Sequence, residues 1–121
     1  MENNSEALSL RIFISSTDKY DGKILHETIV FKAKESGLAG ATVTKGILGF
    51  GASSVIHSYK FWEVTEKLPV IVEIIDKKEK VLEFYESIKP ILESMRYGCL
   101  VATEKVDIML YKTGKEKFFN T

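Results

Sequence analysis

The sequence has little cysteine and no excess charge of either sign. Its single cysteine, Cys99, has no partner for an internal disulfide, and no cysteines and histidines are grouped with the spacing of a zinc site. Lysine plus arginine and aspartate plus glutamate both number 17, so the formal net charge is +0. No global field therefore draws the chain to nucleic acid or to an anionic membrane. These absences predict a protein of a reducing cytoplasm that binds no nucleic acid.

The sequence also lacks a long hydrophobic run. None approaches the roughly 20 apolar residues that a membrane helix needs, and the polar, acidic start is unlike a signal peptide. We therefore expect no membrane insertion. What is present, 121 residues with 45% hydrophobic and 11% aromatic content, fits one globular domain. We expect this domain to span residues 1–121, with its core over residues 8–111 and frayed termini.

The first half of the chain has the periodicity of a strand, a helix and a second strand. Apolar residues alternate along residues 8–15, which is the pattern of a strand with one buried face. Apolar residues at four-residue spacing from Leu25 to Ala33 then predict a helix. We expect this helix to end where Gly37 takes the left-handed C′ conformation. Residues 41–44 are predicted to be a short strand.

The second half repeats this plan. Residues 70–75 are an almost continuous apolar run, typical of a strand that is covered on both faces. Asp76 and Glu79 fit the N-cap and the third position of a following helix, in which Pro90 predicts a kink or a break. Two short strands are expected to complete the chain, over residues 99–102 and 106–111.

Strands that alternate with helices of this length predict an α+β fold, a ferredoxin-like βαββαβ sandwich. Its antiparallel sheet is expected to carry both helices on one face and an extra strand at the C-terminus. Phe13, Phe61 and Trp62 fall among the strand residues, so the other face of the sheet is expected to be apolar. A small two-layer domain commonly buries such a face by self-association, and we therefore predict a closed oligomer.

The stretch from Thr44 to Ser58 is the most unusual part of the sequence, because three of the 8 glycines lie in it. Bare glycine backbone, two serine hydroxyls and two basic side chains can together hold an anion such as phosphate. A hairpin that connects two strands would have the same composition, and this alternative stays open. The candidate ligand-binding residues of this stretch are Lys45, Gly46, Gly49, Gly51, Ser53, Ser54 and His57.

Two ordered motifs give the sequence a family resemblance. G-L-A-G-A-T-V occupies residues 37–43, and G-x-x-G-F-G-A-S-S-x-I-H occupies residues 46–57. Over roughly residues 8–111 the chain is similar to the PII-like family known as domain of unknown function one-ninety. The resemblance implies a ferredoxin-like subunit, usually trimeric, that binds ligands in clefts between subunits. These clefts lie near a long loop that joins the second and third strands, here residues 46–58.

The resemblance also implies a function. Relatives of PII proteins commonly sense adenine nucleotides, so we expect a cytosolic ligand sensor rather than an enzyme, with AMP, ADP or ATP as effector and no resident cofactor. By position, Arg96 and Gly98 in the turn after the second helix would complete the site. The bound effector would order the glycine-rich loop and change its contacts with a regulated partner protein.

Two other functions stay open. His57 with Ser53 or Ser54 would suit a small hydrolase, although the nucleophile-elbow motif G-x-S-x-G is absent. A metal-binding trimer of the copper-tolerance type shares the fold, and in it His57 would pair with an acidic residue of a neighbouring subunit. Cys99 lies in an apolar strand context and is expected to be a buried small hydrophobe rather than a nucleophile.

Overall fold

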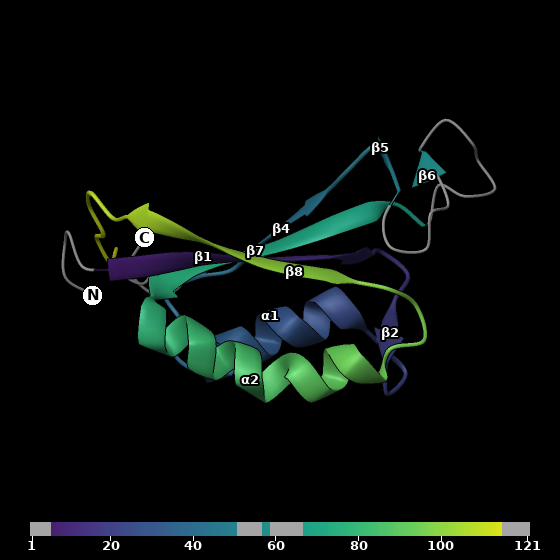
Figure 1. Ribbon diagram of the computed structural model, residues 1–121, viewed down its shortest axis with the longest axis horizontal. Helices are drawn as coiled ribbons and strands as arrows, with labels where there is room; N and C mark the ends of the chain where they lie inside the picture. Colours follow the sequence, from purple (N-terminus) through teal and green to yellow (C-terminus); the bar gives the residue numbers. More distant parts are fainter. Residues whose placement is uncertain (1–5, 51–56, 59–66, 115–121) are drawn as a thin grey trace.

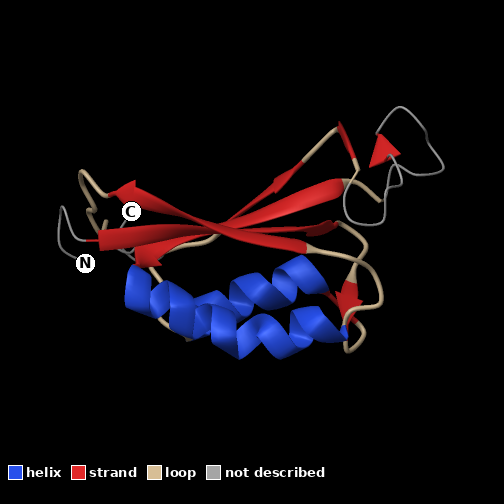
Figure 2. Cartoon of the chain, in the orientation of Figure 1, coloured by secondary structure: helices blue, strands red, loops and turns tan. Residues whose placement is uncertain are grey.

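The periodicities of the sequence are realised as one antiparallel sheet with two helices on one of its faces (Figures 1 and 2). The computed structural model describes residues 6–50 and 67–114, and the backbone of residues 57–58. Its elements are β1 (Glu6–Ser15), β2 (Lys19–Tyr20), β3 (Lys23–Ile24), α1 (Leu25–Glu35), β4 (Thr42–Lys45), β5 (Leu48–Gly49), β6 (His57–Ser58), β7 (Pro69–Lys77), α2 (Lys78–Ser94) and β8 (Leu100–Asp107). The predicted α+β sandwich is confirmed.

The sheet has the strand order β4-β7-β1-β8, and every neighbouring pair is antiparallel. The long strands β1 and β7 form its centre, where Leu10 pairs with Ile74 and Ile12 pairs with Val72. These four side chains are fully buried. Alternation along β1 therefore puts one set of residues against the helices and the other set on the outer face of the sheet.

The core lies between the sheet and the two helices. Helix α1 buries Leu25, Ile29 and Ala33, the residues whose spacing predicted the helix. Helix α2 buries five residues at helical spacing, Val81, Phe84, Ile88, Ile91 and Leu92. Both helices lie on the same face, so the outer face of the sheet is left uncovered in one protomer (Figure 2).

The end of α1 matches the sequence-based prediction. Gly37 has a φ of +77°, and its N–H donates to the carbonyl of Lys34 at 3.1 Å. The Leu38 N–H reaches back to the carbonyl of Ala33 at 3.1 Å, and Leu38 packs against the core. These two bonds form a Schellman motif, which satisfies carbonyls that the helix itself leaves free.

Asp76 does not cap α2, which corrects the sequence-based prediction. It is the second-last residue of β7, the N-cap position of α2 is Lys77, and no side chain bonds at that cap. Asp76 is instead 2% exposed, and its carboxylate accepts hydrogen bonds from the Lys77 N–H and the Ala39 N–H. The partner in the α1–β4 turn is 37 residues away, so no local capping pattern reveals it.

Two further expectations about the second half need revision. Helix α2 continues across Pro90 to Ser94, so of the two predicted alternatives, a kink or a break, the break is wrong. The two predicted C-terminal strands form the single strand β8, which pairs with β1 continuously from Phe13↔Leu100 to Glu6↔Asp107. Residues 108–114 carry no extra strand. The polar run in the middle of β8 does not interrupt the strand, because β8 lies at an edge of the sheet where its side chains reach solvent.

A small hairpin joins β1 to α1. Strands β2 and β3 pair through Lys19↔Ile24 and Tyr20↔Lys23, and Asp21 and Gly22 between them both have positive φ, 52° and 77°. Two successive positive φ angles are the geometry of a type I′ turn. The hairpin lies beside the C-terminal end of α2 (Figure 1). Among the described residues, no helix is long and apolar enough to cross a membrane.

Candidate functional site

The glycine-rich segment begins where β4 leaves the sheet. Lys45 is the last residue of β4 and pairs with Val70 of β7. The next residue, Gly46, donates its N–H to the Pro69 carbonyl at 2.7 Å. Beyond it, β5 and β6 pair through Gly49↔His57 and form an arm that rises away from the helices (Figure 1). The glycine-rich loop predicted from the sequence is therefore a β-hairpin at its base.

At two positions of this arm, packing explains why the residue is glycine. A Cβ added to Gly46 would lie 2.9 Å from Pro69 Cγ, and one added to Gly49 would lie 3.3 Å from the same atom. Neither glycine has a positive φ. Their glycine identity is thus explained by close contact with Pro69 as well as by the anion-binding hypothesis.

The other candidate residues of the segment are only partly described. Gly51, Ser53 and Ser54 lie outside the described residues, as do Phe61 and Trp62. His57 is placed by its backbone in β6. Their assignment to a ligand site therefore stays a prediction. The described tip residues Ile47, Leu48 and Phe50 are exposed, which puts three large apolar side chains in solvent on one arm.

The turn after α2 holds the other two candidates, Arg96 and Gly98. Helix α2 ends as the Met95 N–H donates to the Leu92 carbonyl at 3.2 Å. The Arg96 guanidinium then lies over the Tyr97 ring, 5.5 Å from its centroid, and both side chains are exposed. The arm and this turn lie at the same end of the molecule, but they are separated by the sheet (Figure 1).

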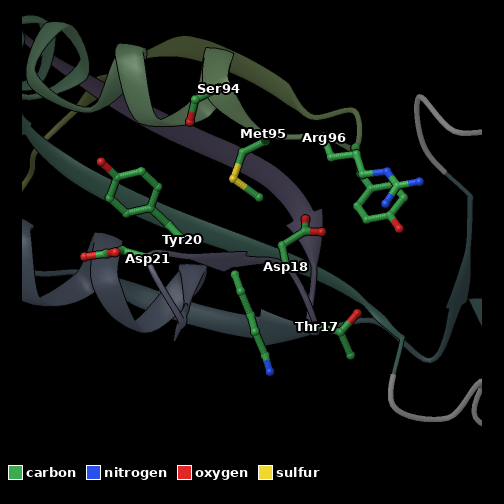
Figure 3. Close-up of a pocket in the computed structure, with 9 residues that line it drawn as sticks. Thr17, Asp18, Tyr20, Asp21, Ser94, Met95 and Arg96 are labelled. Carbon is green, nitrogen blue, oxygen red and sulfur yellow. The ribbon is translucent and has the colours of Figure 1, made fainter.

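A cavity of about 290 Å³ lies beside Arg96, between the hairpin and the end of α2. Figure 3 shows Asp18 in the middle of it, with Tyr20 on one side and Arg96 on the other. Its lining residues are Thr17, Asp18, Lys19, Tyr20, Asp21, Ser94, Met95, Arg96 and Tyr97. Residues 45–50 of the arm take no part in this lining. No motif marked Asp18 in the sequence, and only the fold places the loop after β1 next to the turn after α2.

Cys99 follows this turn and packs against the core. Burial raises the pKa of the Cys99 thiol, and the negative charge of Asp18 raises it further. A thiol with a raised pKa is a poor nucleophile, which agrees with the expectation that Cys99 is a small hydrophobe. Among the described residues, no three histidine, cysteine, aspartate or glutamate side chains are grouped closely enough to hold a metal ion.

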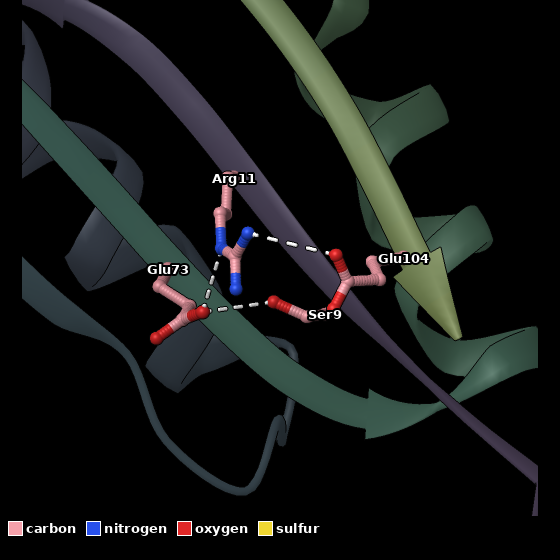
Figure 4. Close-up of polar contacts among 4 residues, drawn as sticks. All are labelled: Ser9, Arg11, Glu73 and Glu104. Carbon is pink, nitrogen blue, oxygen red and sulfur yellow. Dashed lines mark hydrogen bonds and ion pairs between the residues drawn. The ribbon is translucent and has the colours of Figure 1, made fainter. Parts of the chain in front are cut away.

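The outer face of the sheet carries a polar cluster at its centre (Figure 4). Arg11 Nε donates to Glu73 Oε2 at 2.9 Å, and the Ser9 hydroxyl donates to the same oxygen at 2.9 Å. Glu104 of β8 lies farther away, 3.9 Å from Arg11 Nη1. The hydrogen bonds from Arg11 and Ser9 lower the pKa of Glu73 below its usual range. The face that was expected to be apolar is therefore mixed, with Phe13 and the exposed Leu100 beside this cluster.

A family model, DUF190 (uncharacterised ACR), matches residues 7–108 of the chain. A UPF0166 protein of Aquifex aeolicus is 38% identical over 100 residues, which cover 83% of this chain and 90% of that protein. A UPF0166 protein of Methanocaldococcus jannaschii is 34% identical over 88 residues, which cover 69% of this chain and 81% of that protein.

Two solved structures share the fold. One is CPII of Thiomonas intermedia K12, a nitrogen regulatory PII-like protein bound to ADP, AMP and bicarbonate, with a TM-score of 0.58 and 16% identity over 84% of this chain and 89% of that chain. The other is a putative PII-like signaling protein of Thermus thermophilus, with a TM-score of 0.59 and 18% identity over 89% of this chain and 94% of that chain. At these identities the likeness is one of fold.

Proposed function

The chain belongs to the DUF190 family, and on that premise we propose that it is a PII-like regulatory protein that binds an adenine nucleotide between subunits. The family resemblance and the ferredoxin-like fold predicted from the sequence are confirmed. CPII, which shares the fold, is itself bound to ADP and AMP. The observation that supports the proposal is the glycine-rich arm, which starts at Lys45 where β4 leaves the sheet and has glycine at positions 46 and 49.

The proposed nucleotide site lies between protomers because one protomer separates its two parts. The arm rises on the outer side of the sheet, whereas the C-terminal end of α2, which Arg96 follows, lies on the helix side (Figure 1). A phosphate held by glycine amides of one arm therefore meets an Arg96 guanidinium from a neighbouring copy. Amide donors and a guanidinium together supply the charge-assisted hydrogen bonds that phosphate requires.

A homotrimer supplies such clefts, and the outer sheet face is the surface that it would bury. Phe13, Leu100 and the partly exposed Ile75 surround the Arg11–Glu73 pair there. Burying these apolar side chains gives the association its free energy, and the polar pair fixes its register. Copies joined through this face would leave the helices outward.

The arm would carry the signal to a regulated partner protein. Ile47, Leu48 and Phe50 are exposed on it, so a change in its order changes an apolar surface. A nucleotide acts in this way only if it binds the ordered arm more tightly than the open one.

Calorimetric titration of the oligomer with AMP, ADP and ATP tests nucleotide binding. We expect at least one of them to bind, and Gly51→Val to weaken it more than Ser53→Ala, because valine blocks backbone approach whereas alanine removes one hydrogen bond. Gly40→Ala is the control, since a Cβ there meets nothing within 4 Å. Absence of binding by all three nucleotides at millimolar concentration would overturn the proposal.

Light scattering at micromolar concentration tests the trimer. We expect Leu100→Asp to dissociate it, because Leu100 lies on the outer face of β8. Leu82→Asp is the control, since Leu82 is an exposed leucine of α2 on the opposite side of the molecule. A wild-type protein that is only monomeric contradicts this part of the proposal.

A further inference from the structure

We propose that the cavity between the β2–β3 hairpin and the end of α2 binds a small zwitterion of the α-amino acid type. Its ammonium group would lie at Asp18 and its carboxylate at Arg96. This site lies within one protomer, and the inference does not depend on nucleotide binding between protomers.

Asp18 is a buried carboxylate with one oxygen left for a ligand. The residue is 6% exposed, and its backbone is fixed because its N–H donates to the Ser15 carbonyl and its carbonyl accepts from the Leu25 N–H. Its Oδ2 accepts the Ser15 N–H at 2.8 Å. Within the part of the chain that the structure describes, no group hydrogen-bonds Oδ1 and no cation pairs with Asp18. Oδ1 is therefore the carboxylate oxygen that a ligand in the cavity can hydrogen-bond.

The Asp18 carboxylate is turned towards the end of α2 in the cavity (Figure 3). Its negative charge is felt by Cys99 nearby, where it contributes to the raised pKa of that thiol. The cavity therefore presents a fixed anionic group that is not neutralised by its surroundings. A protonated amine is the ligand group that such a carboxylate binds most strongly.

Arg96 gives the same cavity a separate positive group. Among the described residues it forms no ion pair, and its guanidinium only stacks on the Tyr97 ring. Arg96 and Asp18 line one cavity without neutralising each other. The guanidinium points away from Asp18 in Figure 3, so a ligand that carries both charges would bridge them once the exposed Arg96 side chain turns into the cavity. The planar guanidinium binds a carboxylate through two parallel hydrogen bonds.

The size and walls of the cavity set the ligand class. Its volume of about 290 Å³ is just below the usual range of ligand pockets, about 300 to 1,000 Å³, so an amino acid fits better than a nucleotide. Tyr20 and Met95 line it with an aromatic ring and a thioether, which offer an apolar wall to the amino-acid side chain.

A thermal-shift screen of the full-length protein against the common L-amino acids at millimolar concentration is the first experiment, followed by calorimetry with each one that stabilises the protein. We expect at least one to bind, and its N-acetyl and carboxamide derivatives, which lack one charge each, to bind at least about tenfold more weakly. If no amino acid binds, or if the N-acetyl derivative binds equally well, the inference is wrong.

Asp18→Asn is the decisive variant because asparagine keeps an oxygen for the Ser15 N–H and loses only the charge. We expect it to lower amino-acid affinity at least about tenfold without changing the circular-dichroism spectrum. Asp21→Asn is the matched control, since Asp21 is an exposed acid on the rim of the same cavity. An equal loss in both variants, or none in Asp18→Asn, contradicts the assignment of Asp18.

The same variant separates this inference from the nucleotide proposal. Asp18 takes no part in the proposed intersubunit site, so Asp18→Asn should keep wild-type affinity for whichever of AMP, ADP or ATP binds. Gly51→Val should show the reverse, losing nucleotide and keeping amino acid. Arg96→Gln should weaken the binding of both.

Discussion

The turns that follow the two helices differ in how many hydrogen bonds hold them, although each follows the helix of one βαβ half. The turn after α1 is closed by the Schellman motif at Gly37, by the Asp76 carboxylate and by Lys80, whose amine donates to the Gly37 carbonyl at 2.7 Å. The turn after α2 has one backbone bond at Met95 and then exposes Arg96. Each turn lies near one buried aspartate, so the difference is in how that aspartate is used.

Both carboxylate oxygens of Asp76 accept hydrogen bonds from backbone N–H groups, whereas only one oxygen of Asp18 does. Oδ1 of Asp76 accepts from Lys77 at 2.6 Å and Oδ2 accepts from Ala39 at 2.8 Å. A fully satisfied buried carboxylate fixes a turn and leaves no valence for a ligand. A buried carboxylate with one unbonded oxygen can accept a hydrogen bond from a ligand, and the cavity lies beside Asp18, which has such an oxygen.

Replacing Asp76 should destabilise the protein far more than replacing Asp18. Asp76→Asn should lower the free energy of unfolding by about 2 to 3 kcal/mol. Asparagine has only one side-chain oxygen, so its NH2 group would face one of the two backbone N–H donors and leave that donor without an acceptor. Asp18→Asn should change it by less than about 0.5 kcal/mol, since one oxygen is enough there. Urea unfolding at one fixed protein concentration measures both values. Similar losses in the two variants would show that the aspartates are not used differently.

The backbone of the closed turn provides the next prediction. Gly37→Ala should cost about 1 kcal/mol, because an L-residue disfavours the left-handed conformation that Gly37 adopts, and not because of a clash. The nearest atom to an added Cβ is Lys80 Nζ at 4.0 Å. Gly40→Ala serves as the control, since Gly40 lies in the same turn without a positive φ. Equal unfolding midpoints for the two variants would contradict this explanation.

Periodicity predicted both helices, the central strands and the Gly37 turn, because these depend on residues close together in the sequence. The errors arose where a partner is far away. Asp76 looked like a helix cap until its bond to Ala39 placed it between two layers. Asp18 had no motif at all, and its role emerges only when the fold sets residues 94–97 beside the loop after β1. The glycines of the arm were predicted to bind a ligand, but the sequence pattern could not reveal the contact of Gly46 with Pro69.

A smaller effect should come from the side chain that joins α2 to the closed turn. Lys80 Nζ lies 3.8 Å from Asp76 Oδ2 and bonds the Gly37 carbonyl, but its side chain is 44% exposed. Lys80→Met keeps the aliphatic stem and removes these contacts, which should cost about 0.5 kcal/mol. Lys78→Met, which removes a similarly exposed contact with Glu6 outside the turn, is the control. A loss as large as that of Asp76→Asn would mean that the lysine, and not the backbone donors, holds the carboxylate.

The smallest effect concerns a third carboxylate, Glu73, which is partnered by a cation instead of backbone donors and is 37% exposed. Its pKa is lowered in the folded protein, so it contributes stability above its unfolded value of about 4.3 and loses that contribution as the pH falls through the folded value. Solvent screening keeps the effect small. Glu73→Gln should therefore lose less stability than the wild type between neutral pH and about pH 3, measured by urea unfolding. Glu104→Gln, at the longer 3.9 Å contact, is the control, and an acid response of Glu73→Gln equal to that of the wild type would show that the Arg11 pair does not matter for stability.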